Sequence, residues 1–298
     1  MSPIARPRRF DLIAFDWDGT LFDSTAIIVR SIQSAVRDVG GTVPSDSDAA
    51  YVIGMALNQA LAHAAPDVPP EKYGDLNLRY RYHYARHQDD LSLFHGVLPL
   101  LGALRERGHL LTVATGKSRR GLDEALHSVQ LRGVFDGSRT ADETAGKPHP
   151  LMLHELMGEF DVAPERVLMI GDTTHDLQMA CNAGCASLGV SYGAHAPDAF
   201  GALGPLYIAQ SVAMMPNISD TIPLCPSADL QDGGMAVPFD VVYAGETCRA
   251  FAVRFQGAVH AYLNRCAHVP MEMDYQENRF FDDSGRWLLC ATHGATYA

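Results

Sequence analysis

With 298 residues the chain is long enough for about two domains, and its 47% of apolar residues suffices for buried cores. The formal net charge of −12 argues against nucleic acids and anionic membrane surfaces as partners. No apolar run approaches the ~20 residues of a membrane span, and no signal-peptide core precedes the first predicted strand. These features predict a cytoplasmic protein.

The first predicted strand leads into a stretch of acidic residues. Leu12 to Phe15 is an apolar run that fits one buried strand and is too short for a helix. Asp16 and Asp18 follow and, because strand side chains alternate between faces, can point the same way. Gly19 lets the backbone turn sharply towards a ligand. Ligands of open α/β sheets bind at this end of the strands, so a site is predicted here; a solvated strand-to-turn junction is the alternative.

Residues 24–93 change to helical periodicity. Ala26 to Val39 carries apolar residues at helical spacing and ends at a Gly-Gly pair. A second helix, capped by Ser47 or Asp48, is predicted to run through His63, and a third follows a Pro-Pro pair. The third carries the run R-Y-R-Y-H-Y-A-R-H, which can face a substrate, although a half-buried, half-solvated helix is the favoured interpretation. These helices are interpreted as an inserted cap.

Two further segments carry candidate phosphate-binding residues. Leu110 to Ala114 is the second predicted strand, and Thr115 and Gly116 follow it. A hydroxyl and free backbone N–H groups before a helix suit a phosphate oxygen, although Ser or Thr is also the usual helix cap. Val134-Phe135 is predicted as a short third strand. Lys147 precedes a Pro-initiated helix, where it can neutralise a nucleophile and a phosphate; an ordinary surface lysine is the alternative.

The fourth predicted strand, Val167 to Ile170, is followed by Asp172 and Asp176. Two carboxylates near a strand end suit a hard divalent cation such as Mg²⁺, which prefers oxygen ligands in near-octahedral geometry. Ala186 to Val190 and Leu206 to Ala209 are the predicted fifth and sixth strands. This alternation of strands and helices predicts an α/β fold with a doubly wound, Rossmann-like parallel sheet and helices on both faces.

Four motif pieces stand in a characteristic order: D-W-D-G-T, a strand ending at Thr115, G-K-P and G-D-T-T-H-D. In this order and spacing, residues 8–212 resemble the haloacid-dehalogenase-like (HAD) phosphohydrolase superfamily. The cap stretch V-I-G-M-A-L-N-Q-A-L and the small helical insert look like its phosphoglycolate-phosphatase-like branch. The resemblance implies a hydrolase core over residues 8–23 and 94–212, with a helical cap over residues 24–93.

The resemblance also implies a role for each motif residue. Asp16 would attack phosphorus and form an aspartyl-phosphate, and Asp18 would protonate the leaving oxygen and then activate water. The implied phosphate-binding residues are Thr115, Gly116 and Lys147. The implied Mg²⁺ ligands are Asp16, Asp172 and, through its backbone carbonyl, Asp18, while Asp176 would bind the metal directly or hold one of its ligands. The four carboxylates crowded into one cleft are costly without a cation, which is a physical reason to expect one.

The reaction implied is hydrolysis of a small phosphorylated metabolite, similar to phosphoglycolate. Dehalogenases of the family lack an acid/base at the second Asp, so the presence of Asp18 disfavours that activity. A sugar-phosphate mutase on the same scaffold also retains both Asp16 and Asp18, and it stays open as an alternative.

After about Met215 the composition shifts. Three prolines lie between residues 216 and 226, which is typical of a linker. Ala236 to Tyr243, Cys248 to Phe255 and Ala258 to Leu263 are predicted as short β-strands separated by turn residues. A small all-β domain is therefore predicted at the end of the chain.

Two pairs of soft ligands follow these strands, C-x-H and C-x-x-H. The stretch resembles a Rieske-type [2Fe–2S] domain, in which two His replace two Cys on one iron. The resemblance implies that Cys266 and Cys290 bind one iron and that His268 and His293 bind the other; zinc on the same four side chains is the competing interpretation. The chain stops at Ala298, five residues after the last ligand, which predicts an incomplete domain and weak retention of the cluster.

The predicted organisation is a HAD-like hydrolase domain at 1–212, a linker at 213–226 and an incomplete Rieske-like domain at 227–298. The expected partners are a small phosphorylated metabolite and a redox partner for the Rieske module, with no nucleic acid and no membrane. Two alternatives remain open: a protein that acts chiefly in electron transfer or redox sensing, and a fusion whose last domain is inert.

Overall fold

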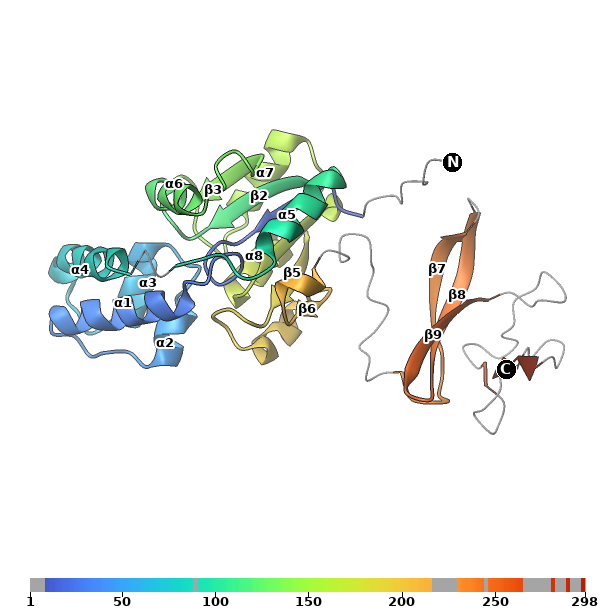
Figure 1. Cartoon of the computed structure of the whole chain (residues 1–298). Helices are drawn as coiled ribbons and strands as arrows, with labels where there is room; N and C mark the ends of the chain where they lie inside the picture. The colour runs from blue at the N-terminus through green and yellow to red at the C-terminus, as the bar shows by residue number, and fades with distance from the viewer. Residues whose placement is uncertain are drawn as a thin grey trace. The chain divides into compact units, whose positions relative to one another are not determined.

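The computed structural model of the chain describes residues 9–87, 91–215, 230–243, 246–264, 280–281, 288–289 and 296–297. The chain divides into two compact units, Met1–Thr221 and Ile222–Ala298 (Figure 1). Within the described ranges, no helix is long and apolar enough to cross a bilayer.

A six-stranded parallel sheet forms the centre of the first unit. The strands are β1 (Leu12–Phe15), β2 (Leu110–Thr115), β3 (Gly137–Thr140), β4 (Val167–Gly171), β5 (Ala186–Val190) and β6 (Ile208–Ala209), in the order β3-β2-β1-β4-β5-β6. Phe15 of β1 lies beside Val113 of β2 and Ile170 of β4. The residues that follow these three central strands therefore leave the sheet at one edge.

Helices cover both faces of the sheet, as the alternating elements predicted. The four helices are α5 (Val97–Glu106), α6 (Arg119–Ser128), α7 (Leu151–Phe160) and α8 (Thr174–Ala183). Ile13 and Phe15 of β1 pack in the hydrophobic cluster to which α5 and α6 contribute. Leu12 and Ala14 point to the other face, into the cluster of α7 and α8. The doubly wound α/β fold is thus confirmed, with β1 buried on both sides.

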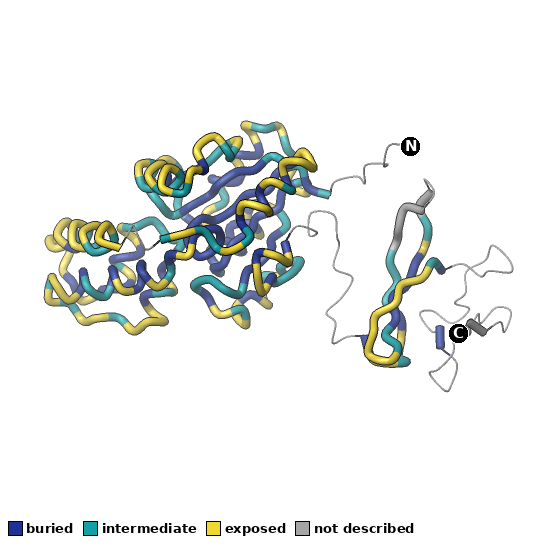
Figure 2. Tube along the Cα trace, in the orientation of Figure 1, coloured by how far each residue is buried: buried dark blue, intermediate teal, exposed yellow. Residues whose placement is uncertain are grey.

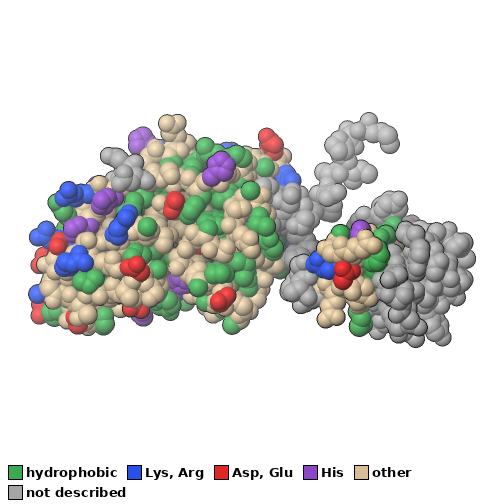
Figure 3. All heavy atoms as spheres, turned by 60° about the horizontal axis from the view of Figure 1, so that its bottom comes forward, with side chains coloured by type: hydrophobic (Ala, Val, Ile, Leu, Met, Phe, Trp, Pro, Cys, Tyr) green, Lys and Arg blue, Asp and Glu red, His purple; other side chains and the backbone are tan. Residues whose placement is uncertain are grey.

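The cap consists of α1 (Thr25–Asp38), α2 (Asp46–Tyr51), α3 (Leu57–Ala64), the 3₁₀ helix η1 (Pro70–Lys72) and α4 (Tyr73–Ala85). It has a hydrophobic core of its own, built mainly from α1, α3 and the loops beside them, and Figure 2 shows buried segments among the exposed ones of the cap. Leu78 and Tyr82 of α4 are exposed. On the face drawn in Figure 3, Lys, Arg and His side chains lie mostly over the cap.

The single second helix predicted for the cap is wrong, because the segment forms two helices. Gly54 adopts a positive φ of 90°, a left-handed conformation that interrupts helical hydrogen bonding between α2 and α3. The cap of α2 is also earlier than predicted: Ser45 accepts a hydrogen bond from the Asp48 N–H at 3.1 Å.

The third strand also differs from the prediction. Val134 and Phe135 lie in the turn after α6, where their side chains pack against the core without pairing as a strand. Asp136 then joins the sheet edge, since its N–H donates to Leu111 O at 2.7 Å, and β3 begins at the next residue. Their apolar character reflects packing under the sheet edge rather than strand pairing.

The second unit contains an antiparallel sheet in the order β7-β8-β9, formed by β7 (Val237–Tyr243), β8 (Glu246–Phe255) and β9 (Ala258–Leu263). These strands confirm the three predicted from the sequence. Phe251 stacks on Phe280, with ring centroids 3.5 Å apart. Two short strands, β10 (Leu288–Leu289) and β11 (Thr296–Tyr297), form a second antiparallel pair.

Candidate active site

Three carboxylates predicted as metal ligands converge at the carboxyl ends of the central strands. Asp16 follows β1, Asp172 follows β4, and Asp176 lies in the first turn of α8. One oxygen from each lies within 4.8 Å of the others, and all three side chains are buried. The parallel register brings Asp16 next to two acids that lie 156 and 160 positions further along the chain.

Local hydrogen bonds fix the orientation of this acidic cluster. Thr173 caps α8, and its hydroxyl donates to the Asp176 carboxylate at 2.6 Å. The Asp172 carboxylate accepts hydrogen bonds from the Thr20 hydroxyl at 2.9 Å and from the Ala194 N–H at 2.7 Å. Gly19 has a φ of 81°, which confirms the predicted sharp turn, and a Cβ there would collide with the Asp172 carboxylate; close approach to a ligand stays a prediction.

Lys147 is the buried cation of the cluster. Its ammonium contacts one oxygen of Asp16 and lies 2.6 Å from Asp176 Oδ1. Burial by itself lowers the pKa of Lys147, but the two carboxylates outweigh it and raise the pKa above that of an ordinary lysine. The predicted surface-loop alternative for Lys147 is therefore wrong, because the side chain is fully buried.

One ammonium does not balance three carboxylates. Burial raises the pKa of Asp16 well above its usual range, although Lys147 opposes the shift. Burial, followed by repulsion from Asp176, raises the pKa of Asp172 to about 7. Asp16 Oδ2 is buried and has no hydrogen-bond partner among the described residues. Three buried carboxylates with a single ammonium between them, and with one oxygen that lacks a partner among the described residues, are suited to bind a hard divalent cation.

The Asp18 carboxylate points away from this cluster. Its Oδ1 accepts a hydrogen bond from the Ser24 hydroxyl at 2.6 Å, and its Oδ2 lies 3.1 Å from Lys117 Nζ. The two acids of the first motif thus have separate environments, which suits two different chemical roles. The proposed contribution of the Asp18 backbone carbonyl to a metal site stays a prediction.

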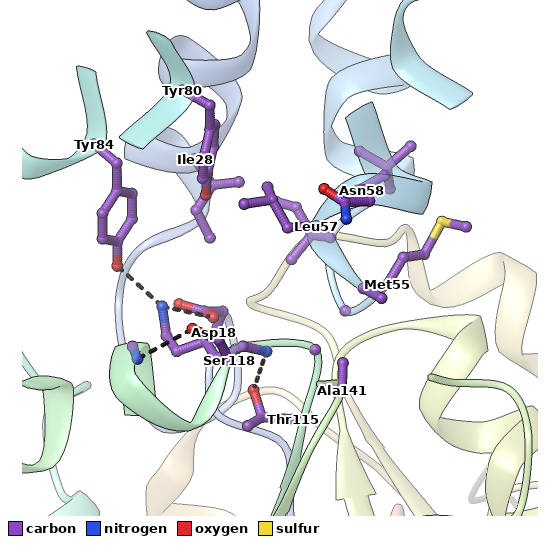
Figure 4. A pocket seen from close by; sticks show the side chains of 18 of the residues that line it. Asp18, Ile28, Met55, Leu57, Asn58, Tyr80, Tyr84, Thr115, Ser118 and Ala141 are labelled. Atoms are coloured by element: carbon purple, nitrogen blue, oxygen red, sulfur yellow. Dashed lines mark hydrogen bonds and ion pairs between the residues drawn. The ribbon is translucent and has the colours of Figure 1, made fainter. Parts of the chain in front are cut away.

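Lys117 is a site residue that the sequence analysis did not identify. It belongs to the loop after β2, and it joins Asp18 to the cap: its ammonium donates to the Tyr84 hydroxyl at 3.2 Å and lies 4.9 Å from the Tyr84 ring centroid (Figure 4). Burial lowers the pKa of Lys117, but the Asp18 carboxylate together with the hydroxyls of Tyr84 and Tyr80 outweighs burial and raises this pKa. The T-G-K-S motif was visible in the sequence, but its pairing with cap residues was not.

Thr115 and Gly116 lie at the core side of a cavity of about 690 Å³ between cap and core. The Thr115 hydroxyl accepts a hydrogen bond from the Lys117 N–H at 3.2 Å. A Cβ at Gly116 would collide with the backbone carbonyls of Gly54 and Met55 in the cap. Glycine is thus required where the predicted phosphate-binding loop meets the cap.

A second contact between cap and core involves two histidines. His175 of α8 and His195, in the segment after β5, place their Nε2 atoms 2.9 and 3.0 Å from the Tyr51 carbonyl oxygen. His195 Nδ1 accepts a hydrogen bond from the Thr174 N–H at 3.0 Å, so its Nε2 carries the proton donated to Tyr51. The Tyr51 ring stacks on His195, with centroids 5.4 Å apart.

We expect His195→Ala to destabilise the first unit by roughly 1–3 kcal/mol, because it leaves the N–H of half-buried Thr174 without its His195 acceptor and removes one donor from the Tyr51 carbonyl. Urea unfolding followed by circular dichroism measures the change. The matched control is His63→Ala, since exposed His63 contacts the Tyr51 ring without a hydrogen bond to its carbonyl and should change stability by less than about 0.5 kcal/mol. Equal effects of the two substitutions would contradict the prediction.

Fold and site together define a capped α/β hydrolase with its acidic centre at the carboxyl edge of a parallel sheet. Residues 13–190 match the model of the haloacid dehalogenase-like hydrolases, and the chain belongs to this family. Residues 220–298 match the Rieske [2Fe–2S] domain. Both resemblances inferred from the motifs are confirmed.

Curated relatives and a solved structure agree with this assignment. The chain is 31% identical over 195 residues to the phosphoglycolate phosphatase of Mannheimia succiniciproducens, covering 62% of this chain and 87% of the relative. It is 31% identical over 214 residues to that of Vibrio vulnificus, covering 68% and 93%. A crystal structure described as a "predicted phosphoglycolate phosphatase" from Haemophilus somnus 129pt has a TM-score of 0.64 at 26% identity, covering 71% of this chain and 98% of that one.

The two families imply two cofactors, Mg²⁺ for the hydrolase and a [2Fe–2S] cluster for the Rieske domain. The acidic cluster fits Mg²⁺, because its donors are carboxylate oxygens that lie close together. The four side chains implied for the second, Cys266, His268, Cys290 and His293, lie outside the described residues.

The raised pKa of Asp172 predicts a pH-dependent stability in the absence of divalent cations. Its pKa is about 7 when folded and about 3.8 as an ordinary carboxyl, so the folded state binds more protons between these values. The free energy of unfolding should therefore fall as the pH rises from about 4 to 7, and Mg²⁺ should oppose this fall.

Melting temperatures at pH 5 and pH 7.5, with chelator or with Mg²⁺, measure this effect. The control is Asp172→Asn, in which the chelator-treated protein should show a smaller fall in melting temperature. The raised pKa of Asp172 would be contradicted if, with chelator, the melting temperature of the wild type rose between pH 5 and pH 7.5 relative to that of Asp172→Asn.

Proposed function

We propose that the first unit is a Mg²⁺-dependent phosphatase that hydrolyses a small phosphorylated metabolite through an aspartyl-phosphate on Asp16. The observation that supports it most is the position of Asp16, which directly follows the central strand β1 and has Lys147 on one oxygen and, among the described residues, no hydrogen-bond partner on the other. The Lys147 ammonium thus offsets charge on one Asp16 oxygen, while the other oxygen, left without a partner in the described part of the chain, is the one proposed to form the bond to phosphorus.

In the first step, an Asp16 oxygen forms a bond to phosphorus while the bond from phosphorus to the leaving alcohol breaks. Asp18, protonated for this step, gives its proton to the leaving oxygen. Ser24 and Lys117 hold the two Asp18 oxygens in position. In the second step, water attacks phosphorus and gives a proton back to Asp18, which releases phosphate and restores Asp16.

Other residues bind and neutralise the phosphoryl group. Lys147 offsets negative charge beside Asp16, and the hydroxyl of Thr115 and the N–H of Gly116 are proposed to bind phosphoryl oxygens at the floor of the cavity. Mg²⁺ held by Asp16, Asp172 and Asp176 would supply further neutralisation of the transferred group.

A phosphate-release assay tests this function. The full chain is incubated with a panel of small phosphomonoesters, phosphoglycolate included, with Mg²⁺ or with chelator. Mg²⁺-dependent release from at least one compound is expected. A folded protein that releases no phosphate from any compound would refute the phosphatase, and isomerisation of a sugar phosphate without release would identify a mutase instead.

For the second unit we propose a Rieske-like module that binds a [2Fe–2S] cluster through Cys266, His268, Cys290 and His293 and exchanges electrons with a redox partner. The proposed domain limits are 1–212, 213–226 and 227–298, and the division of the chain into compact units near residue 221 supports two domains. Iron and sulfide analysis after anaerobic purification tests the cluster. A colourless protein with zinc instead of iron would favour the zinc alternative.

A further inference from the structure

The apolar cap side of the active-site cavity points to the chemistry of the substrate. We infer that the leaving group of the phosphomonoester is neutral, apolar and about the size of an aromatic ring. This inference rests on the proposed phosphatase activity and specifies the substrate class of that same site. It follows from the residues that line the cavity, from their charges and from the size of the space.

The wall of the cavity opposite the acids is mostly apolar, with Asn58 of α3 as its polar member. Ile28 and Ile32 come from α1, Met55 from the turn before α3, and Leu57 from the first turn of α3. Figure 4 shows Ile28 and Leu57 between the cap helices and Asp18, on the side away from Thr115. An apolar leaving group buried against such a wall is removed from water, which stabilises the bound state.

Two tyrosines of α4 add an aromatic surface to this wall. Tyr80 and Tyr84 both line the cavity, with ring centroids 5.9 Å apart and an interplanar angle of 25°. The Tyr84 hydroxyl is engaged by Lys117. In Figure 4, Tyr80 lies beside Ile28 above Asp18, so its ring is placed to contact the part of a substrate that extends from the phosphate.

The charges around the cavity do not favour an anionic leaving group. Among the described lining residues, the half-buried Lys117 is already paired with Asp18 at 3.1 Å. Arg120 pairs with Glu124 at 2.8 Å and is solvent-exposed. Arg81 is exposed as well, where an ion pair contributes little. A carboxylate beside Asp18 would therefore meet repulsion without a free buried cation among the described lining residues.

The size of the cavity also exceeds that of a two-carbon leaving group. Its volume of about 690 Å³ lies within the range of roughly 300–1,000 Å³ that holds drug-sized ligands. Glycolate would leave the wall formed by Ile28, Leu57 and Tyr80 without a contact. A single missing methylene in an apolar pocket costs about 10- to 200-fold in specificity, so a ring-sized group should be strongly preferred.

The test uses four monoesters of primary alcohols, so that leaving-group reactivity stays comparable: benzyl phosphate, 4-carboxybenzyl phosphate, ethyl phosphate and phosphoglycolate. Phosphate release by the full chain with Mg²⁺ gives kcat/KM for each. We expect kcat/KM for benzyl phosphate to exceed that for each of the other three at least about tenfold. Ethyl phosphate isolates the effect of size, and 4-carboxybenzyl phosphate isolates the effect of charge.

Two substitutions on α4 provide a matched pair. Tyr80→Ala should lower the benzyl-to-ethyl ratio of kcat/KM by about tenfold or more, because it removes the aromatic surface from the cavity. Tyr82→Ala removes the same side chain from the exposed face of α4 and should leave the ratio unchanged. Competitive inhibition of the wild type by benzylphosphonate, compared with phosphonoacetate, gives the same information if Tyr80→Ala does not fold.

The outcomes separate this inference from the proposed function. Mg²⁺-dependent release in which benzyl phosphate fails to exceed the other compounds tenfold overturns the inference and leaves the phosphatase standing. Absence of Mg²⁺-dependent release from every compound overturns the phosphatase itself. A preference for benzyl phosphate that is lost in Tyr80→Ala and kept in Tyr82→Ala supports both the phosphatase and the apolar leaving group.

Discussion

Asp16→Asn is expected to abolish phosphate release, lowering kcat by at least about four orders of magnitude, while the protein stays folded. An amide oxygen carries no negative charge and cannot form the aspartyl-phosphate. The substitution also removes a carboxylate whose pKa is raised by burial, so the melting temperature of the chelator-treated protein should not fall. Phosphate release and circular dichroism melts measure the two effects.

The matched control is Asp23→Asn, because Asp23 belongs to the same motif stretch but is exposed. This variant should retain activity within about twofold of the wild type, as is usual for surface positions away from a site. Turnover by Asp16→Asn near the wild-type rate would show that another group attacks phosphorus. Equal losses in both variants would instead indicate a general effect of the altered loop.

Lys147→Met is expected to destabilise the first unit by about 3–5 kcal/mol at neutral pH, because it leaves the buried carboxylates of Asp16 and Asp176 without their cation. The loss should be smaller at pH 5, where the carboxyl groups can take up protons, and smaller again with Mg²⁺. Urea unfolding at pH 5 and pH 8 with chelator measures it. Phosphate release should fall as well, since the charge beside the nucleophile is lost.

Lys72→Met is the control for this substitution. Lys72 is exposed and its ammonium donates to the Val39 carbonyl in the cap, so its removal should change stability by less than about 0.5 kcal/mol. A Lys147→Met variant that loses less than about 1 kcal/mol at pH 8 would show that the buried carboxylates are not ionised together with this lysine.

The acidic centre could be predicted because its residues directly follow strands that are recognisable from local sequence. Leu12 to Phe15 and Val167 to Ile170 are short apolar runs, and parallel pairing aligns their carboxyl ends at one edge. The predictions failed where a local pattern had two physical explanations. Val134 and Phe135 are apolar because they pack under the sheet edge, and Gly54 divides a segment whose periodicity is continuous.

The cap stretch R-Y-R-Y-H-Y-A-R-H shows the same limit. Its spacing favoured a half-buried helix, and α4 is indeed exposed at Tyr82, yet Tyr80 and Tyr84 line the cavity. The sequence does not reveal which face of an amphipathic helix meets solvent and which meets a substrate, because both faces can carry tyrosine. That choice depends on how the cap docks on the core.

The parallel α/β core, the acids Asp16 and Asp172 at its strand ends and the three strands of the second unit follow from the amino-acid sequence, because each depends on residues close in the chain or on strand ends that must align. The burial of Lys147 does not, because a lysine in a loop is by local sequence an ordinary surface residue. The packing of the folded chain also places Lys117 against Asp18 and Tyr84, and His195 against the Tyr51 carbonyl. These contacts join the cap to the core across 33 to 144 residues. These contacts depend on how the cap packs against the core, and local secondary-structure propensity does not predict that packing.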